Sequence, residues 1–159
     1  MVSILALDPG GTTGYCYATI SENVVILTPR EARWSPGQLY EFLFGFMGED
    51  QGRAKSHVIY EDFQFRQGIR TGLDLTPAKL IGVIEVFSER SQFVKFYVQQ
   101  PSIQGDKAFF TNDRLKELGA YWPHGKGHAR SATKHLLYWL KFGAGAQYVT
   151  DPTFVMEEG

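Results

Sequence analysis

Residues 2–8, VSILALD, run directly into residues 9–15, PGGTTGY, and this junction decides the fold. An apolar run that does not alternate with polar residues is typical of a central β-strand covered on both faces. The glycines that follow indicate a turn, so the strand ends on a carboxylate, Asp8. A second apolar run, HVIYE at residues 57–61, also ends on a carboxylate, Glu61. If the two strands are neighbours, these acids meet at one edge of the sheet.

The remaining segments follow the order expected of an α/β layer fold with a mixed sheet. We expect strands at 2–8, 14–20, 23–28, 57–61 and 93–99, the first three as an antiparallel meander, and helices beginning at Ser35-Pro36, at Thr76-Pro77, near Asn112 and near His128. Apolar residues at helical spacing and proline at the first helical position support these helices. The sequence therefore predicts a single domain over residues 1–150, with a five-stranded sheet flanked by helices, and a flexible tail over 151–159.

Composition narrows the classes of protein that fit. The chain has 159 residues and a formal net charge of −1, which suits one domain and leaves no overall positive field to attract nucleic acid. A DNA-binding surface would have to be a local basic patch. The one cysteine, Cys16, excludes an internal disulfide and a cysteine-rich zinc site. We find no signal peptide and no apolar run of membrane-spanning length, so a cytoplasmic protein without a membrane partner is expected.

The two strand-terminal acids, Asp8 and Glu61, indicate a candidate metal site. Two close carboxylates repel each other, and a divalent cation with oxygen ligands is the usual way in which proteins resolve that repulsion. The plainer alternatives are that Asp8 is a turn residue bonded to its own backbone and that Glu61 is a surface charge. Asp62 follows Glu61 directly, but side chains alternate along a strand, so only one of the two can point into a shared site.

The helix expected over residues 128–142 adds a polar face to this region. At about 100° per residue, His128, Ser131 and His135 fall within roughly 60° of one another. An apolar stripe of Ala129, Ala132, Leu136 and Leu140 lies beside them, and a basic face of Arg130, Lys134 and Lys141 lies on the other side. On periodicity alone, the histidines could equally be boundary residues and the cations a solvated surface.

Three motifs together resemble the RuvC-type Holliday junction resolvases, particularly the short forms encoded by bacteriophages. They are ILALDPGGTTGY, VIYEDF and GHARSATKHLLYWL, and the resemblance spans residues 2–142. It rests on their order and spacing. It implies a ribonuclease H-like fold and a crossover junction endodeoxyribonuclease that resolves Holliday junctions and other branched DNA by phosphodiester hydrolysis. It also implies Mg²⁺ or Mn²⁺, two ions per active site, a homodimer, and the host bacterial cytoplasm if the protein is phage-encoded.

The resemblance also assigns roles to four residues. Asp8 would bridge the two metal ions, Glu61 would bind one of them, and His128 would bind the second or orient the attacking water. Ser131 stands where the family has its last carboxylate. A neutral hydroxyl is a weak ligand for a hard cation, so metal affinity should fall by at least the roughly 10–100-fold known for lost outer-shell partners.

Three compensations for Ser131 remain open. The serine could hold a metal-bound water, or Asp62 or His135 could supply the missing interaction. A loss of cleavage is the other possibility, and the protein would then be a clamp that binds junctions without cutting them. Two further rivals are a phosphate- or nucleotide-binding domain of the actin and sugar-kinase type, for which the Gly-Thr-rich turn is suited, and a nuclease for RNA–DNA hybrids or flaps.

Candidate DNA contacts come from basic and aromatic residues other than Asp8, Glu61, His128 and Ser131. We expect phosphate contacts from Arg66, Arg70, Lys107, Arg130 and Lys134, and base stacking from Phe65, Phe109 and Phe110. Each has a plain alternative as a solvated cation or a core ring. The helix at Thr76 and the aromatic-rich helix before it are the expected subunit interface.

Overall fold

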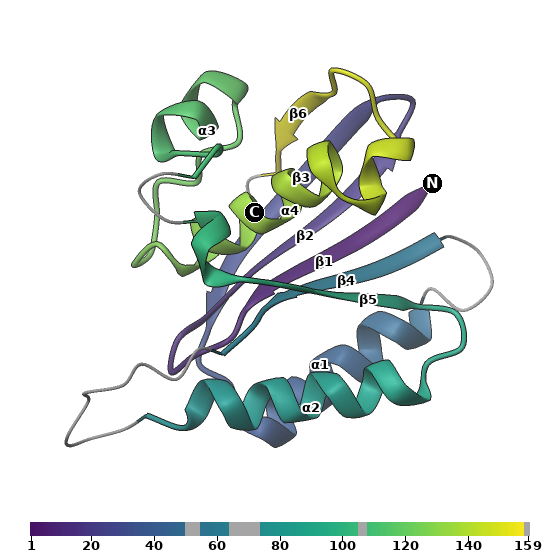
Figure 1. Cartoon of the computed structure of the whole chain (residues 1–159), viewed down its shortest axis with the longest axis vertical. Helices are drawn as coiled ribbons and strands as arrows, with labels where there is room; N and C mark the ends of the chain where they lie inside the picture. Colours follow the sequence, from purple (N-terminus) through teal and green to yellow (C-terminus); the bar gives the residue numbers. More distant parts are fainter. Residues whose placement is uncertain (50–54, 64–73, 105–107, 158–159) are drawn as a thin grey trace.

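The computed structural model describes residues 1–49, 55–63, 74–104 and 108–157, and these fold around a mixed six-stranded sheet (Figure 1). The strands are β1 (Val2–Asp8), β2 (Thr13–Ser21), β3 (Val24–Ala32), β4 (Lys55–Glu61), β5 (Lys95–Gln99) and β6 (Thr153–Met156), in the order β5-β4-β1-β2-β3-β6. The first three form the predicted antiparallel meander, β4 lies parallel to β1 and β5 parallel to β4, and β6 lies parallel to β3.

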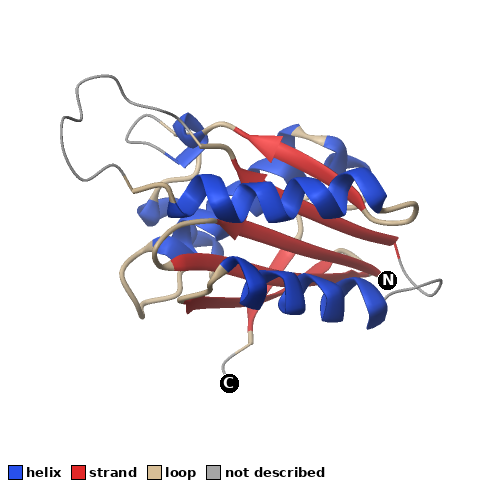
Figure 2. Ribbon diagram, turned by 90° about the horizontal axis from the view of Figure 1, so that it is seen from below, coloured by secondary structure: helices blue, strands red, loops and turns tan. Residues whose placement is uncertain are grey.

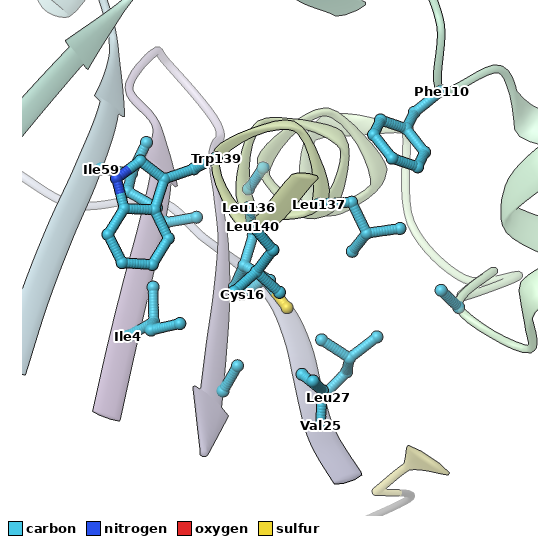
Figure 3. Close-up of a cluster of buried hydrophobic side chains, with 14 of the residues drawn as sticks. Ile4, Cys16, Val25, Leu27, Ile59, Phe110, Leu136, Leu137, Trp139 and Leu140 are labelled. Atoms are coloured by element: carbon cyan, nitrogen blue, oxygen red, sulfur yellow. The ribbon is translucent and has the colours of Figure 1, made fainter. Parts of the chain in front are cut away.

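Helices cover both faces of the sheet (Figures 1 and 2). They are α1 (Pro36–Glu49), α2 (Thr76–Arg90), α3 (Asn112–Leu118) and α4 (His128–Phe142), with short 3-10 turns η1 (Pro101–Gln104) and η2 (Ala144–Gln147). Alternation along β1 divides the core: Ile4 and Ala6 pack with α4, whereas Leu5 and Leu7 pack with α1 and α2. Figure 3 shows the α4 side, where Trp139 and Leu136 meet strand residues such as Ile4.

Local sequence signals set several helix starts. Gln38 N donates to Ser35 Oγ at 3.2 Å and Ser35 N donates to Gln38 Oε1 at 2.9 Å, which is a capping box for α1. Thr111 caps α3 by accepting from Arg114 N at 3.2 Å. At α2, Thr76 is already helical, and its N–H donates to Asp74 Oδ1 at 2.9 Å. The N-cap residue of α4, Gly127, has no side chain to do the same.

The end of the chain differs from the expected flexible tail and from the expected five strands. Thr153–Met156 form β6 against Val24–Leu27 of β3, and Glu157 N donates to Leu27 O at 2.8 Å. A segment of four residues whose partner is distant in sequence carries little local signal, because its pairing depends on tertiary contacts.

Strand β3 is also longer than expected, since it continues past Pro29 to Ala32. Among the described residues β6 pairs only with Val24–Leu27, so β3 is an edge strand at Pro29. Edge strands tolerate proline because its missing N–H costs no ladder hydrogen bond there. This extension carries Glu31 to the same end of the sheet as Asp8. None of the helices in the described ranges has the length and apolar character needed to cross a membrane.

Candidate active site

One row of residues crosses five neighbouring strands at the end of the sheet where β1 and β4 stop. Asp8 pairs with Gly14 of β2, Gly14 pairs with Glu31 of β3, and Glu61 of β4 pairs with Gln99 of β5. Asp8 and Glu61 each follow directly on the parallel pair formed by Leu7 and Tyr60, so they lie at the same level. The two strand-terminal acids are thus side by side, as the sequence predicts.

The row faces α4. The residues two positions earlier on these strands, such as Ala6 on β1 and Ile59 on β4, pack in the core beneath α4. Side chains alternate along a strand, so Asp8 and Glu61 point to the same face. Asp62 has the opposite parity, and its Oδ1 accepts a hydrogen bond from Phe63 N at 2.9 Å. The structure therefore leaves Asp62 out of the cluster.

Burial and proximity make Asp8 hard to ionise. Its side chain is 14% exposed and that of Glu61 is 12% exposed. Desolvation raises the pKa of Asp8 to about 8, helped by the negative charge of Glu61, a hydrogen bond shared with Glu61 and the more distant charge of Glu31. Without a cation, the Asp8 carboxyl therefore keeps its proton near neutral pH, and a divalent ion beside the two acids would relieve this cost of ionisation.

The first turn of α4 brings His128 to the other side of Asp8. His128 Nδ1 lies 3.5 Å from Asp8 Oδ2, and the histidine side chain is 41% exposed. The imidazole therefore stands at the solvent-facing rim, with one nitrogen directed at the acid. The predicted trio of Asp8, Glu61 and His128 is brought together.

His135 occupies the floor of the same region, two turns further along α4. It is completely buried, with Nε2 2.8 Å from Glu61 Oε2 and Nδ1 2.7 Å from Gln99 Oε1. Ser131 lies between the two histidines on this helix face, and its Oγ donates to Gly127 O at 3.2 Å. The contacts of His135 fix the carboxylate of Glu61 from below.

Removing the His135 imidazole should therefore be costly for stability. His135→Ala leaves a cavity and takes a buried partner from Glu61 and Gln99, so we expect the free energy of unfolding to fall by about 2–4 kcal/mol. Urea unfolding of the wild type and of His135→Ala measures this difference. The exposed His124 is a matched control, since His124→Ala should change stability by less than about 0.5 kcal/mol. Equal effects of the two substitutions would contradict the anchoring role of His135.

Gly14 lets α4 reach the row. A Cβ atom at Gly14 would meet the main-chain carbon and oxygen of His128 and the main-chain nitrogen of Ala129. The start of α4 therefore rests on the bare backbone of β2, between Asp8 on one side and Glu31 on the other. Any side chain at Gly14 would push His128 away from Asp8.

Glu31 is a member of the row that the sequence did not reveal as a site residue. Its carboxylate accepts hydrogen bonds from the main-chain N–H groups of Lys126, His128 and Ala129, at 2.9 to 3.3 Å. Desolvation alone would raise the pKa of Glu31, but these hydrogen bonds and the nearby His128 outweigh it and hold the pKa below its ordinary value. The alternation of Val25 and Leu27 was a usable signal, because it assigns Glu31 to the α4 face once β3 is extended.

The donor set fits a magnesium ion that is completed by other ligands. In the described part of the chain, no three His, Cys, Asp or Glu side chains converge closely enough to hold a metal ion by themselves. Mg²⁺ is, however, usually held by one or two carboxylates and retains waters or substrate phosphate oxygens as its remaining ligands. Asp8 and Glu61 form such a pair.

The expected DNA contacts have separate locations. Arg66, Arg70, Lys107 and Phe65 lie outside the described residues. Arg130 Nη1 donates to Trp122 O and His124 O, at 3.0 and 3.1 Å, so this guanidinium holds the loop that precedes α4. Phe109 lies at the far end of α4, where the Arg114 guanidinium is 3.9 Å from its ring centre. Phe110 is buried in the core, which excludes it from stacking on bases.

Phe109 borders a groove of about 620 Å³ between α3, the end of α4 and the segment before β6. Lys141 lies 5.4 Å from the same ring centre. The ring is partly exposed, as a stacking surface requires. Lys134, on the polar side of α4, is half-buried.

Comparison with known proteins gives likeness in fold alone. No protein-family model and no curated protein sequence matches the chain. Among solved structures, RuvC from T. thermophilus in complex with Holliday junction substrate matches with a TM-score of 0.61 and 15% identity, over 90% of this chain and 98% of that one. The yeast mitochondrial Holliday junction resolvase Ydc2 matches with a TM-score of 0.51 and 15% identity, over 91% of this chain and 80% of that one. The chain therefore has the mixed α/β arrangement of the ribonuclease H-like fold.

Proposed function

We propose that the protein is a metal-dependent endonuclease that cleaves branched DNA, with four-way junctions as its substrate. The observation that carries this proposal is the convergence of Asp8 and Glu61 from adjacent parallel strands, with His128 facing Asp8 from α4. The fold shared with two Holliday junction resolvases supports the choice of substrate. The raised pKa of Asp8 supports the need for a cation.

Each residue has a distinct part in the proposed reaction. Asp8 and Glu61 hold Mg²⁺ or Mn²⁺, and His135 keeps the Glu61 carboxylate oriented through the contact between Nε2 and Oε2. When bound, the metal supplies Lewis acidity that stabilises negative charge on the phosphate and lowers the pKa of a water molecule. His128, exposed at the rim, is placed to orient the attacking water or to bind a second ion. The buried sheet row fixes these groups on rigid elements, which favours accurate positioning.

Cleavage of synthetic substrates tests the proposal directly. The protein should nick a four-way junction in Mg²⁺ or Mn²⁺, should leave linear duplex and RNA–DNA hybrid largely intact, and should be inactive in EDTA. Binding of the junction without nicks in either metal would contradict the nuclease assignment and favour a junction-binding clamp. Cleavage of the hybrid in preference to the junction would contradict the substrate assignment.

Ser131 limits metal affinity in this proposal. Ser131→Asp adds a carboxylate on the α4 face between His128 and His135, so we expect the Mg²⁺ concentration for half-maximal cleavage to fall about 10–100-fold. A metal titration of the cleavage rate measures this. Ser131→Ala removes the hydroxyl without adding charge and should shift the midpoint by less than about threefold. A Ser131→Asp variant that titrates like the wild type would show that the helix face does not reach the ion.

DNA binding would use cations and rings along α4 and beyond it. We assign phosphate contacts to Lys134 and to Arg66, Arg70 and Lys107. Arg130 joins them through the part of its guanidinium not used by the loop carbonyls. Phe109, with the adjacent Arg114 and Lys141 charges, offers a partly exposed ring for an unpaired base.

A homodimer would give the two matched nicks that a two-fold symmetric junction requires. The candidate interface is the outer surface of α1 and α2. Tyr40 and Phe44 of α1 are exposed and stack with ring centres 6.3 Å apart, and Tyr40 also contacts Phe87 of α2. Exposed neighbouring rings of this kind are characteristic of protein interfaces.

A further inference from the structure

We propose that Glu31 is a positioning residue that fixes the first turn of α4, and with it His128, over Asp8. This inference rests on the proposed nuclease function and adds a residue from a strand that supplies none of the other assigned groups. It concerns the placement of His128 and assigns no metal ligation to Glu31.

Glu31 performs the capping that α4 lacks locally. The N-cap residue Gly127 makes no side-chain hydrogen bond to the helix, and the first N–H groups of a helix have no intrahelical acceptor. Glu31 Oε2 accepts from His128 N at 3.0 Å and from Ala129 N at 3.3 Å, and Oε1 accepts from Lys126 N at 2.9 Å. A residue 97 positions earlier in the chain therefore supplies the cap.

The loop before α4 is shaped around this carboxylate. Gly125 and Gly127 have φ values of +70° and +100°, which favour glycine. A Cβ atom at Gly125 would also meet the carboxylate of Glu31. The chain thus wraps around Glu31 in a conformation that few other residues adopt.

Both oxygens of Glu31 are occupied by main-chain donors, which separates its role from that of Asp8 and Glu61. The position of His128 depends most on this cap, because His128 is the first residue of α4 and helices fray from their ends. Gly14 holds this turn against the sheet from below, and Glu31 ties it to β3 from the side. The distance of 3.5 Å between His128 Nδ1 and Asp8 Oδ2 depends on both.

Three variants test the inference. Glu31→Ala removes all of the cap acceptors, Glu31→Gln retains one acceptor oxygen, and Thr111→Ala removes the cap of α3, which lies outside the site. We expect Glu31→Ala to slow single-turnover cleavage at least tenfold while the junction Kd changes less than about twofold. Glu31→Gln should recover at least a threefold faster rate than Glu31→Ala. Glu31→Ala and Thr111→Ala should each lower the melting temperature by about 2–4 °C. At saturating junction concentration, where any loss of DNA affinity has no effect, Thr111→Ala should cleave like the wild type.

A second readout is independent of activity. In the uncleaved, DNA-free protein, amide hydrogen exchange at Lys126, His128 and Ala129 should accelerate in Glu31→Ala, and the His128 ring resonances should shift. Unchanged exchange, or a cleavage rate within twofold of the wild type, would overturn the inference, as would an equal loss of cleavage in Thr111→Ala. If the wild type cleaves no junction, the proposed function fails, and amide exchange alone then decides whether Glu31 positions His128.

Discussion

Asp8→Asn is expected to reduce junction cleavage at least about 10³-fold while making the metal-free protein more stable at pH 8. Asp8 is the central acid of the row, with Glu61 on one side and His128 on the other. The amide keeps the shape of the side chain and removes the charge that would hold a cation. Loss of several kcal/mol of charge stabilisation in the transition state corresponds to this reduction in rate.

The stability effect has a defined direction with pH. The pKa of Asp8 is raised from 3.8 to about 8 in the folded protein, so between these values the folded state holds a proton that the unfolded state has released. The free energy of unfolding of the metal-free wild type should therefore fall as pH rises from about 4 to about 8. Asp8→Asn has no such proton to lose, and at pH 8 it should be more stable than the wild type by about 2–4 kcal/mol.

Chemical denaturation at pH 5 and at pH 8, each with and without Mg²⁺, measures both parts of this prediction. Mg²⁺ should stabilise the wild type at pH 8 and should have little effect on Asp8→Asn. Asp62→Asn is the matched control, because Asp62 lies outside the cluster and its Oδ1 contact with Phe63 N survives in the amide. A variant at Asp8 that retains cleavage, or that is less stable than the wild type at pH 8, would contradict the proposed site.

Gly14→Ala adds a single methyl group, and we expect it to displace the start of α4. The new Cβ would overlap main-chain atoms of His128 and Ala129, and no side-chain rotation can relieve a backbone contact. We expect α4 to shift outward, the free energy of unfolding to fall by about 2–4 kcal/mol, and cleavage to fall at least about 10²-fold because a misplacement of about 1 Å is costly for a catalytic group.

Gly82→Ala supplies the comparison for this substitution. Gly82 lies within α2, and a Cβ atom there would meet nothing within 4 Å. Alanine is favoured over glycine in a helix, so Gly82→Ala should stabilise the protein by about 0.5–1 kcal/mol, and it leaves the contacts of His128 untouched. Thermal unfolding and cleavage assays of both variants give the result. A Gly14→Ala protein as stable and active as the wild type would show that α4 does not need this close approach.

The sequence was informative where a single element carries the signal. The apolar runs that end at Asp8 and Glu61 predicted both strands and the meeting of their carboxylates, because parallel neighbours end at the same edge. Helical periodicity put His128 and His135 on one face of α4, and the structure brings both to the acids. These features depend on periods of two and 3.6 residues that can be read locally.

The sequence was least informative where two distant segments define a feature together. No sequence pattern near Gly14 predicts that it contacts a helix more than a hundred residues later in the chain. Glu31 lies beyond residue 28, where the strand was expected to end. Its partners are main-chain N–H groups, which every residue but proline has and which a sequence pattern therefore does not single out. The last strand, β6, is recognisable only when β3 is present as its partner.

The order in which the row and α4 are synthesised has a consequence for the cell. Asp8, Gly14 and Glu31 are synthesised before Glu61, and His128 and His135 are synthesised after all four of them. A nascent chain therefore exposes paired acids without the helix that completes their surroundings. Under the proposed function, a partial translation product that ends before α4 would lack His128 and His135 and would not nick DNA.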